Sequence, residues 1–264
     1  MTIERVSSAD GTSIAFERTG DGPPLVLVGG AFCDRTARAS GTPLAALLSP
    51  HFTAISYDRR GRGDSSDSAN WALEHEIEDL GAVIRAAGGS AYVYGISSGA
   101  VLGLAAAARE LPISKLALYE PPLMLDPGRA AVFGDLAEQL RGHAAAGRRS
   151  EAAELFLTRV VQVPSPAVAQ MKQGPMWRGL EALAHTLSYD VRITALTPAL
   201  LDQAPGAHAE TLALYGEACP PWMRDAILAL AKAMPKGSAR MLAGQTHDVD
   251  PQLLANALRE FFGA

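Results

Sequence analysis

The fold of this chain is decided by one stretch, Ala91-Tyr92-Val93-Tyr94-Gly95-Ile96-Ser97-Ser98-Gly99-Ala100. Its first half is apolar and aromatic, which predicts a buried strand, and the small residues from Ala100 to Arg109 predict a helix. Between them stands a G-x-S-x-G motif, in the strand–turn–helix setting that gives this motif its mechanical meaning. So sharp a turn lifts the hydroxyl of the serine at its apex clear of the sheet. We therefore predict that Ser97 is a nucleophile.

The neighbours of Ser97 support this interpretation. A Cβ atom at Gly95 or Gly99 would collide with the strand and helix where they cross, which explains a glycine at both places. Because the helix begins directly behind Ser97, its positive end and the N–H of Ser98 point at whatever Ser97 attacks. The alternative is a chance motif in a chain with 25 glycines. The strand before it and the helix after it argue against chance.

Composition excludes several classes of function. The 264 residues, 48% of them hydrophobic and 19% charged, suffice for one large α/β domain or a core with an inserted subdomain. The net charge is −5 and no long basic cluster occurs, so nucleic acid is not an expected partner. No signal sequence or membrane-length apolar run is present, and Cys33 and Cys219 fit neither a metal site nor a disulfide framework. We expect a cytoplasmic protein that binds neither membrane nor metal.

Strand and helix patterns alternate on both sides of the serine motif. Predicted strands cover 2–7, 13–18, 25–28, 52–57, 113–119, 211–216 and 238–242. Predicted helices between and after them cover 43–48, 73–87, 222–234 and 251–262. From 123 to 205 the alternation stops, and three helical patterns with proline-containing joints take its place. We predict a mostly parallel sheet, a core of residues 1–122 and 206–264, and a helical cap at 123–205.

Several of these features, in this order, resemble the α/β-hydrolase family across nearly the whole chain. The features are a predicted hairpin, Gly29-Gly30-Ala31-Phe32 after a strand, Asp58-Arg59-Arg60-Gly61-Arg62-Gly63-Asp64-Ser65, the serine motif, the helical insertion and a histidine near the C-terminus. The resemblance implies the α/β-hydrolase fold, with a mainly parallel eight-stranded sheet and a helical cap after the sixth strand. It also implies a Ser–acid–His triad that works without a cofactor.

His247 is the predicted base. It follows the last predicted strand, which matches the chain order serine, acid, histidine. A neutral imidazole there takes the hydroxyl proton and returns it to the leaving group. The remaining histidines are expected on the surface or in the cap: His51, His75, His143, His185 and His208.

The acid departs from the common family pattern, in which an Asp follows the seventh strand. Here Cys219 occupies that place, and we expect it to be a small buried residue and not a nucleophile. Glu120, directly after the sixth strand, is the predicted acid, because the imidazolium needs a buried anion to orient and stabilise it. The alternatives are that Glu120 only caps a nearby loop, that Glu217 is the acid, or that the triad is incomplete.

The placement of Glu120 resembles a branch that includes the zearalenone lactonases, and also some haloalkane dehalogenases. The lactonases share a Ser-Ser-Gly-Ala turn, Glu-x-Pro after the sixth strand, no Asp after the seventh, and a Trp in the cap. The matching residues are Ser97-Ser98-Gly99-Ala100, Glu120-Pro121-Pro122, Cys219 and Trp177.

Substrate contacts are predicted around the serine. The N–H groups of Ala31 and Ser98 are expected to converge on the developing alkoxide as an oxyanion hole. Gly30, Phe32, Met124 and Trp177 are assigned to substrate binding, and the indole N–H of Trp177 can hold a substrate oxygen. The alternative is that the apolar members of this group form only the core of the cap.

Together these residues favour a serine hydrolase, without cofactor or metal, that cleaves an ester or lactone of an apolar small molecule. Thioester or C–C bond cleavage uses the same triad and stays open. Epoxide hydrolysis and dehalogenation do not fit, since both need a carboxylate nucleophile. The competing hypothesis is a non-hydrolytic protein on the same fold, either a binding protein or a cyclase or epimerase. It is motivated by the missing Asp after the seventh strand.

Overall fold

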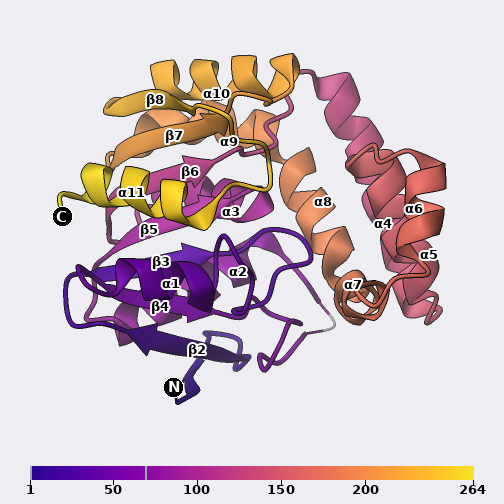
Figure 1. Ribbon diagram of the computed structural model, residues 1–264, viewed down its shortest axis with the longest axis horizontal. Coiled ribbons are helices and arrows are strands. Elements are labelled where there is room, and N and C mark those ends of the chain that lie inside the picture. The colour runs from indigo at the N-terminus through magenta and orange to yellow at the C-terminus, as the bar shows by residue number, and fades with distance from the viewer. Residues whose placement is uncertain (1, 69) are drawn as a thin grey trace.

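The computed structural model describes residues 2–68 and 70–264; Met1 and Ala69, which the predicted core includes, lie outside the described residues. Within that part of the chain, eight strands form one sheet in the order β1-β2-β4-β3-β5-β6-β7-β8 (Figure 1). The strands are β1 (Glu4–Ser7), β2 (Ser13–Thr19), β3 (Pro24–Val28), β4 (Thr53–Tyr57), β5 (Ala91–Ile96), β6 (Ile113–Tyr119), β7 (Glu210–Gly216) and β8 (Gly237–Leu242). The strands predicted from the sequence agree with these to within a few residues.

The sheet is mostly parallel, as predicted. The hairpin of β1 and β2 joins β4 in the antiparallel sense, and all pairs from β4 to β8 are parallel. The central strand β3 is buried from Leu25 to Val28, which explains its continuous apolar sequence. In the register, Val28 pairs with Gly95, and Ile96 pairs with Tyr119. The carboxyl ends of β3, β5 and β6 therefore meet at one edge of the sheet.

Helices cover both faces of the sheet. On one face α1 (Thr42–Leu48) and α11 (Pro251–Phe262) contact each other and share an apolar cluster with β3 and β5. On the other face lie α2 (Leu73–Ala86), α3 (Ser98–Ala108) and α10 (Pro221–Ala233), whose buried residues join a second cluster with the sheet. This arrangement of a flanked, eight-stranded, mostly parallel sheet confirms the predicted α/β-hydrolase fold.

Between β6 and β7 the described chain forms helices alone; we call residues 123–205 the cap segment. Its helices are α4 (Pro127–Ala145), α5 (Arg149–Leu155), η1 (Phe156–Val160), α6 (Ser165–Met171), α7 (Trp177–Leu183), η2 (Ala184–Thr186), α8 (Leu187–Ala195), α9 (Thr197–Gln203) and η3 (Ala204–Gly206). The sequence patterns predicted three helices here and missed α6, α8 and α9. Two of these, α6 and α9, are seven residues long and carry a proline in their first turn, so their periodic signal is short.

The cap segment lies at one end of the sheet, at the right of Figure 1. Helix α8 packs against α4 on one side and against α3, the helix behind Ser97, on the other. Its residue Asp190 is buried. Among the described residues, no helix combines the length and the apolar character that crossing a membrane requires.

Candidate active site

Ser97 stands at the turn between β5 and α3 in a strained conformation. Its φ is 56° and its ψ is −128°, outside the regions that serine normally adopts. A Cβ atom at Gly95 would lie 2.5 Å from the carbonyl oxygen of Gly99, and one at Gly99 would lie 2.4 Å from that of Val28. Both glycines are thus required by the close crossing of strand and helix, as the sequence predicted.

His247 and Glu120 are joined side chain to side chain. The Nδ1 atom of His247 lies 2.7 Å from Oε2 of Glu120, whose side chain is 1% exposed, whereas the imidazole is about half exposed. The other carboxylate oxygen of Glu120, Oε1, accepts a hydrogen bond of 2.9 Å from the N–H of Gly216. Two residues 127 positions apart in the chain therefore meet, with the carboxylate buried and the imidazole reaching toward solvent.

Hydrogen bonds of Tyr119 connect this pair to the serine turn. The N–H of Ser97 donates to the carbonyl of Tyr119, the residue before Glu120, at 2.9 Å. The hydroxyl of Tyr119 donates at 2.6 Å to the carbonyl of Thr246, the residue before His247. Tyr119 therefore anchors both the serine turn and the histidine loop at the end of β6.

The rival acids occupy other environments. Cys219 is 7% exposed, so its predicted burial is confirmed; that burial, together with the charge and hydrogen bond of Glu120, raises the pKa of its thiol to about 12. Glu217 is exposed, and its carboxylate accepts a hydrogen bond from the N–H of Gly244 at 2.8 Å. In this geometry Glu120 contacts the imidazole, Cys219 contacts Glu120, and Glu217 holds a turn.

The loop after β3 lies directly against the serine. A Cβ atom at Gly30 would come within 2.9 Å of Cβ and 3.5 Å of Oγ of Ser97. Ser98 is the first residue of α3, so its N–H has no partner inside the helix. Across residues 2–68 and 70–264, neither this amide nor that of Ala31 donates a hydrogen bond. Two free N–H groups beside one hydroxyl suit a site where negative charge develops.

Backbone strain gathers around this site. Ser97, Phe32 and Glu120 all have a left-handed φ, at 56°, 56° and 44°, although none is a glycine. Strained residues persist only where the surroundings hold them, and they cluster at functional sites. In the described chain only Glu110 and Gln162 share this feature among the non-glycine residues.

The fold agrees with comparisons to known proteins. A model of the Alpha/beta hydrolase family matches residues 25–261. The chain belongs to the alpha/beta hydrolase family. A solved structure of an alpha/beta hydrolase from Sphaerobacter thermophilus DSM 20745 is 47% identical, with a TM-score of 0.86, and the match covers 98% of this chain and 100% of that one.

Solved structures with named activities are similar at lower identity. A thermophilic esterase from Thermogutta terrifontis is 22% identical, with a TM-score of 0.75, over 99% of this chain and 98% of that one. An enol-lactonase from Burkholderia xenovorans LB400 is 22% identical, with a TM-score of 0.66, over 98% and 100%. At such identity the likeness shows the fold alone. The finer resemblance to the zearalenone lactonases stays a prediction.

Of the residues predicted to bind substrate, all but Gly30 belong to or pack against one apolar cluster. Met124 and Trp177 are buried in it, and Ala31 and Phe32 pack against it. The ring of Phe32 meets the edge of Phe156, at the start of the π-helical turn η1, with centroids 5.3 Å apart. The loop after β3, which carries the predicted oxyanion donor Ala31, and the cap segment are therefore in direct contact.

Trp177 corrects one detail of the prediction. Its indole N–H donates to Ser150 at 2.9 Å and to Glu181 at 3.0 Å, both within the cap segment. The hydrogen bond that we expected it to offer a substrate is therefore already engaged, because a buried indole needs an acceptor. Its ring remains the part that can contact a ligand.

Sequence reasoning missed a buried ion cluster beside the hydrolase site. Arg59 and Arg62, from the loop after β4, both donate to the carboxylate of Asp190 on α8. The hydroxyl of Ser98 donates to the same carboxylate at 2.7 Å. The arginines lie in the quoted family-like loop, but no sequence pattern points from them to an aspartate about 130 positions away. The only sequence signal for this cluster was the unusual density of arginine in that loop.

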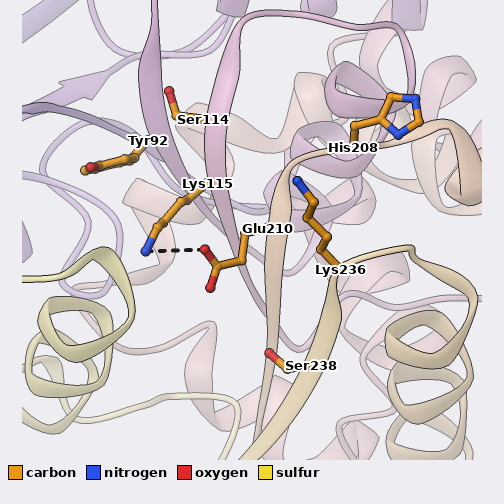
Figure 2. A pocket seen from close by; sticks show the side chains of 7 residues that line it. All are labelled: Tyr92, Ser114, Lys115, His208, Glu210, Lys236 and Ser238. Carbon is orange, nitrogen blue, oxygen red and sulfur yellow. Dashed lines mark ion pairs between the residues drawn. The ribbon is translucent and has the colours of Figure 1, made fainter.

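Figure 2 shows a separate surface pocket, of about 600 Å³, that none of these residues lines. It is lined by Tyr92, Ser114, Lys115, His208, Glu210, Lys236 and Ser238. Several of these are the first or second residue of β5, β6, β7 or β8, whereas Ser97 and Glu120 follow the last residues of their strands. In open α/β sheets ligands bind at the carboxyl ends of the strands, so we assign no catalysis to this pocket.

Proposed function

We propose that this chain is a serine hydrolase that cleaves ester or lactone bonds of apolar small molecules. The observation that carries the proposal is the 2.7 Å contact between His247 Nδ1 and the buried carboxylate of Glu120, next to the strained turn of Ser97. A contact at Nδ1 leaves Nε2 as the nitrogen that exchanges a proton with the serine. In the proposed chemistry the side chains supply nucleophile, base and acid, and no cofactor is needed.

The proposed reaction has two stages. Ser97 Oγ attacks the carbonyl carbon while His247 takes the hydroxyl proton, and the N–H groups of Ala31 and Ser98 hold the oxyanion. The intermediate then collapses, the C–O bond breaks, and His247 gives its proton to the leaving alcohol. A water molecule, activated by the same imidazole, hydrolyses the acyl-serine. Glu120 stabilises the imidazolium in both stages.

Apolar surroundings support an apolar substrate. Phe32, Met124 and Trp177 belong to one cluster between the oxyanion loop and the cap segment. In the neighbouring ion cluster, Arg59 and Arg62 are balanced by Glu76 and Asp190. No unbalanced positive charge in this cluster is available to recognise an anionic substrate. We propose that residues 123–205 form the cap that covers the substrate, with Gly30 leaving room beside the serine.

The nucleophile is tested with a fluorophosphonate probe, which reacts with an activated serine. We expect the wild-type protein to be labelled and Ser97→Ala to stay unlabelled. Ser65→Ala is the matched control, because Ser65 lies in a loop and bonds backbone groups of Asp58 and Ala15. Equal labelling of wild type and Ser97→Ala would overturn the proposal.

The acid is tested by two parallel substitutions. Glu120→Gln removes the anion beside His247, and we expect turnover of a fluorogenic ester to fall about 10³-fold or more. Glu217→Gln removes an exposed carboxylate of the same type, and we expect turnover to change less than about twofold. The reverse ranking would refute Glu120 as the acid.

The competing hypothesis is a non-hydrolytic protein on this fold. It was motivated by Cys219 at the place where most relatives carry an aspartate. The contact of Glu120 with His247 favours hydrolysis, since another carboxylate is in reach of the imidazole. Inertness toward a broad panel of esters and lactones, together with tight binding of an apolar ligand, would favour the competing hypothesis instead.

A further inference from the structure

We propose that Arg62 and Asp190 are positioning residues that aim the N–H of Ala31 at the oxyanion and couple the oxyanion hole to cap helix α8. The inference rests on the proposed function, because it concerns how the proposed oxyanion hole is held. It adds two residues that touch neither the substrate nor the reacting atoms.

The Ala31 N–H belongs to the peptide between Gly30 and Ala31, and Arg62 binds the carbonyl of that peptide. Arg62 Nη1 donates a hydrogen bond to the carbonyl oxygen of Gly30. The described chain contains no cis peptide, and in a planar trans peptide the N–H points opposite to the carbonyl. Holding the Gly30 oxygen on one side therefore directs the Ala31 N–H to the other side. Arg59 Nη1 holds the preceding carbonyl, that of Gly29, at 3.2 Å.

Arg62 also strengthens the donor. Its side chain is 1% exposed, so the hydrogen bond is made in a medium of low dielectric constant. A charged donor on the carbonyl polarises the peptide, and hydrogen bonds in a chain reinforce one another. The Ala31 N–H is thereby aimed and made a better donor before any substrate arrives.

Arg62 is held in turn by Asp190. Its Nη2 donates to both carboxylate oxygens of Asp190, at 2.8 and 2.9 Å. Among the described residues Asp190 is the only anion paired with Arg62, whereas Arg59 is paired with both Asp190 and Glu76. Burial alone would raise the pKa of Asp190, but Arg62, Arg59 and the Ser98 hydroxyl outweigh burial and lower it. Asp190 is therefore an anion on which the position of Arg62 depends.

Asp190 links both predicted oxyanion donors to the cap segment. Asp190 belongs to α8, and the Ser98 hydroxyl donates to it at 2.7 Å. Ser98 also carries the second predicted oxyanion N–H. The Asp190 carboxylate thus bonds Arg62, which orients the Ala31 N–H. It also bonds the side chain of Ser98, the residue that carries the second predicted donor. The packing of α8 on the core and the assembly of the oxyanion hole are therefore coupled.

The chain offers a matched control for a purely structural role. Arg60, in the same loop, makes an equally buried pair with Asp79, with bonds of 2.7 and 2.8 Å. Arg60 also bonds Asp10 and the carbonyl of His75, and not the loop after β3. Asp79→Asn and Asp190→Asn therefore each remove one buried charge beside an arginine, and only Asp190→Asn reaches the oxyanion hole.

The experiment compares these variants of the full chain, each corrected for its folded fraction. For Asp190→Asn we expect kcat on a fluorogenic ester to fall about 10- to 100-fold, below the 10²- to 10³-fold cost of losing an oxyanion donor outright. KM should change less than about threefold, and fluorophosphonate labelling of Ser97 should slow by the same factor as kcat. The pH at which kcat/KM falls by half should be the same as in wild type, because Asp190→Asn does not alter His247 or Glu120.

The control and two milder variants complete the test. Asp79→Asn should keep kcat within about twofold of wild type. Ser98→Ala removes only a hydroxyl, and Arg62→Lys keeps the charge but not the forked geometry; both should fold and lower kcat about 3- to 10-fold. If Asp190→Asn does not fold, these two decide the question.

Two results would overturn the inference. One is a wild-type kcat in folded Asp190→Asn, Ser98→Ala or Arg62→Lys; the other is an equal loss in Asp190→Asn and Asp79→Asn. Failure of the proposed function is distinguishable, because wild type would then either not be labelled or be labelled no more than Ser97→Ala.

Discussion

At the scale of single residues, Gly30 leaves no room for a side chain beside Ser97. The Cβ of an alanine at position 30 would lie 2.9 Å from Ser97 Cβ and 3.0 Å from the carbonyl oxygen of Ile96. Either the oxyanion loop or the serine must shift, so we expect Gly30→Ala to lower kcat/KM about 10²-fold. Steady-state kinetics on a fluorogenic ester measure this.

Gly134→Ala is the control for that substitution. Gly134 lies in α4 with open space around its Cα, so an alanine there fits. We expect activity to be unchanged and the free energy of unfolding to rise by up to about 1 kcal/mol, from helix propensity. Equal activity of Gly30→Ala and Gly134→Ala would contradict the close packing of Gly30 on the serine.

Cys219 provides a second prediction at this scale. Its side chain touches Glu120 from the position where the acid stands in most relatives. We expect the double variant Glu120→Gln with Cys219→Asp to regain at least about tenfold of the activity that Glu120→Gln loses, because it returns a carboxylate to the site. Glu120→Gln with Ala218→Asp puts the new carboxylate on an exposed neighbour and should regain nothing. Equal recovery in both double variants would refute this prediction.

The residues of the proposed triad could be selected from the sequence for a physical reason. Ser97 and Glu120 follow β5 and β6 directly, His247 lies in the loop after β8, and the carboxyl ends of parallel strands meet at one edge. The strain at Phe32 and the partner of Arg62 were not predictable. A left-handed φ depends on what surrounds the residue, and Asp190 reaches Arg62 only after the cap segment folds back onto the core.

At the scale of elements, α3 shows how tightly the serine turn is packed. A Cβ atom at Gly99 would lie 2.4 Å from the Val28 oxygen and 2.5 Å from the Gly29 oxygen, and both are backbone atoms that cannot move aside cheaply. We expect Gly99→Ala to lower the free energy of unfolding by at least about 2 kcal/mol. For a chain of this size that is a drop in Tm of roughly 4–8 °C, measured by calorimetry.

Gly103 is the comparison within the same helix. A Cβ there would lie 3.3 Å from Cδ1 of Leu116, a side-chain atom that can adjust. We expect Gly103→Ala to be neutral or stabilising, since it replaces a helical glycine. A similar loss of stability in both variants would show that α3 does not pack against β3 as the structure describes.

Elements of the core were also easier to predict than those of the cap segment. The strands and the helices between them carry long, strong patterns, whereas α6 and α9 are seven residues long. Helix α8 has a polar residue, Asp190, buried in the middle, because the two arginines of the core neutralise it. A pattern that treats charged residues as solvent-facing therefore cannot find the face that α8 presents to the core.

At the scale of the whole molecule, one loop joins parts of the chain that are far apart. The three arginines after β4 pair with Asp10 in the hairpin region, Glu76 and Asp79 in α2, and Asp190 in α8. Removing one member of such a buried set leaves an uncompensated charge, which costs about 3–5 kcal/mol. The loop after β4 thus fixes the hairpin, the core helix α2 and the cap segment relative to one another.

The molecule also buries tyrosines whose ionisation opposes folding at high pH. Tyr57 and Tyr94 are buried, their hydroxyls lack hydrogen-bond partners within the described residues, and burial raises the pKa of both above 10. The unfolded chain releases these protons near pH 10, while the folded protein retains them. The folded state therefore binds more protons, so stability is full below about pH 9 and falls as the pH rises through 10.

An alkaline titration checks that stability falls, and does not rise, with increasing pH. Of the six tyrosines, we expect at least two to show their ionisation absorbance at 295 nm only when the circular dichroism of the fold is lost. Tyr57→Phe removes a buried hydroxyl without a partner, so it should not lower stability at pH 7, and it should weaken the fall above pH 9. Ionisation of all six tyrosines in the folded protein would contradict the prediction. The same variant distinguishes tyrosine ionisation from thiol or carboxylate ionisation as the cause of the stability loss at high pH, because Tyr57→Phe changes no thiol and no carboxylate.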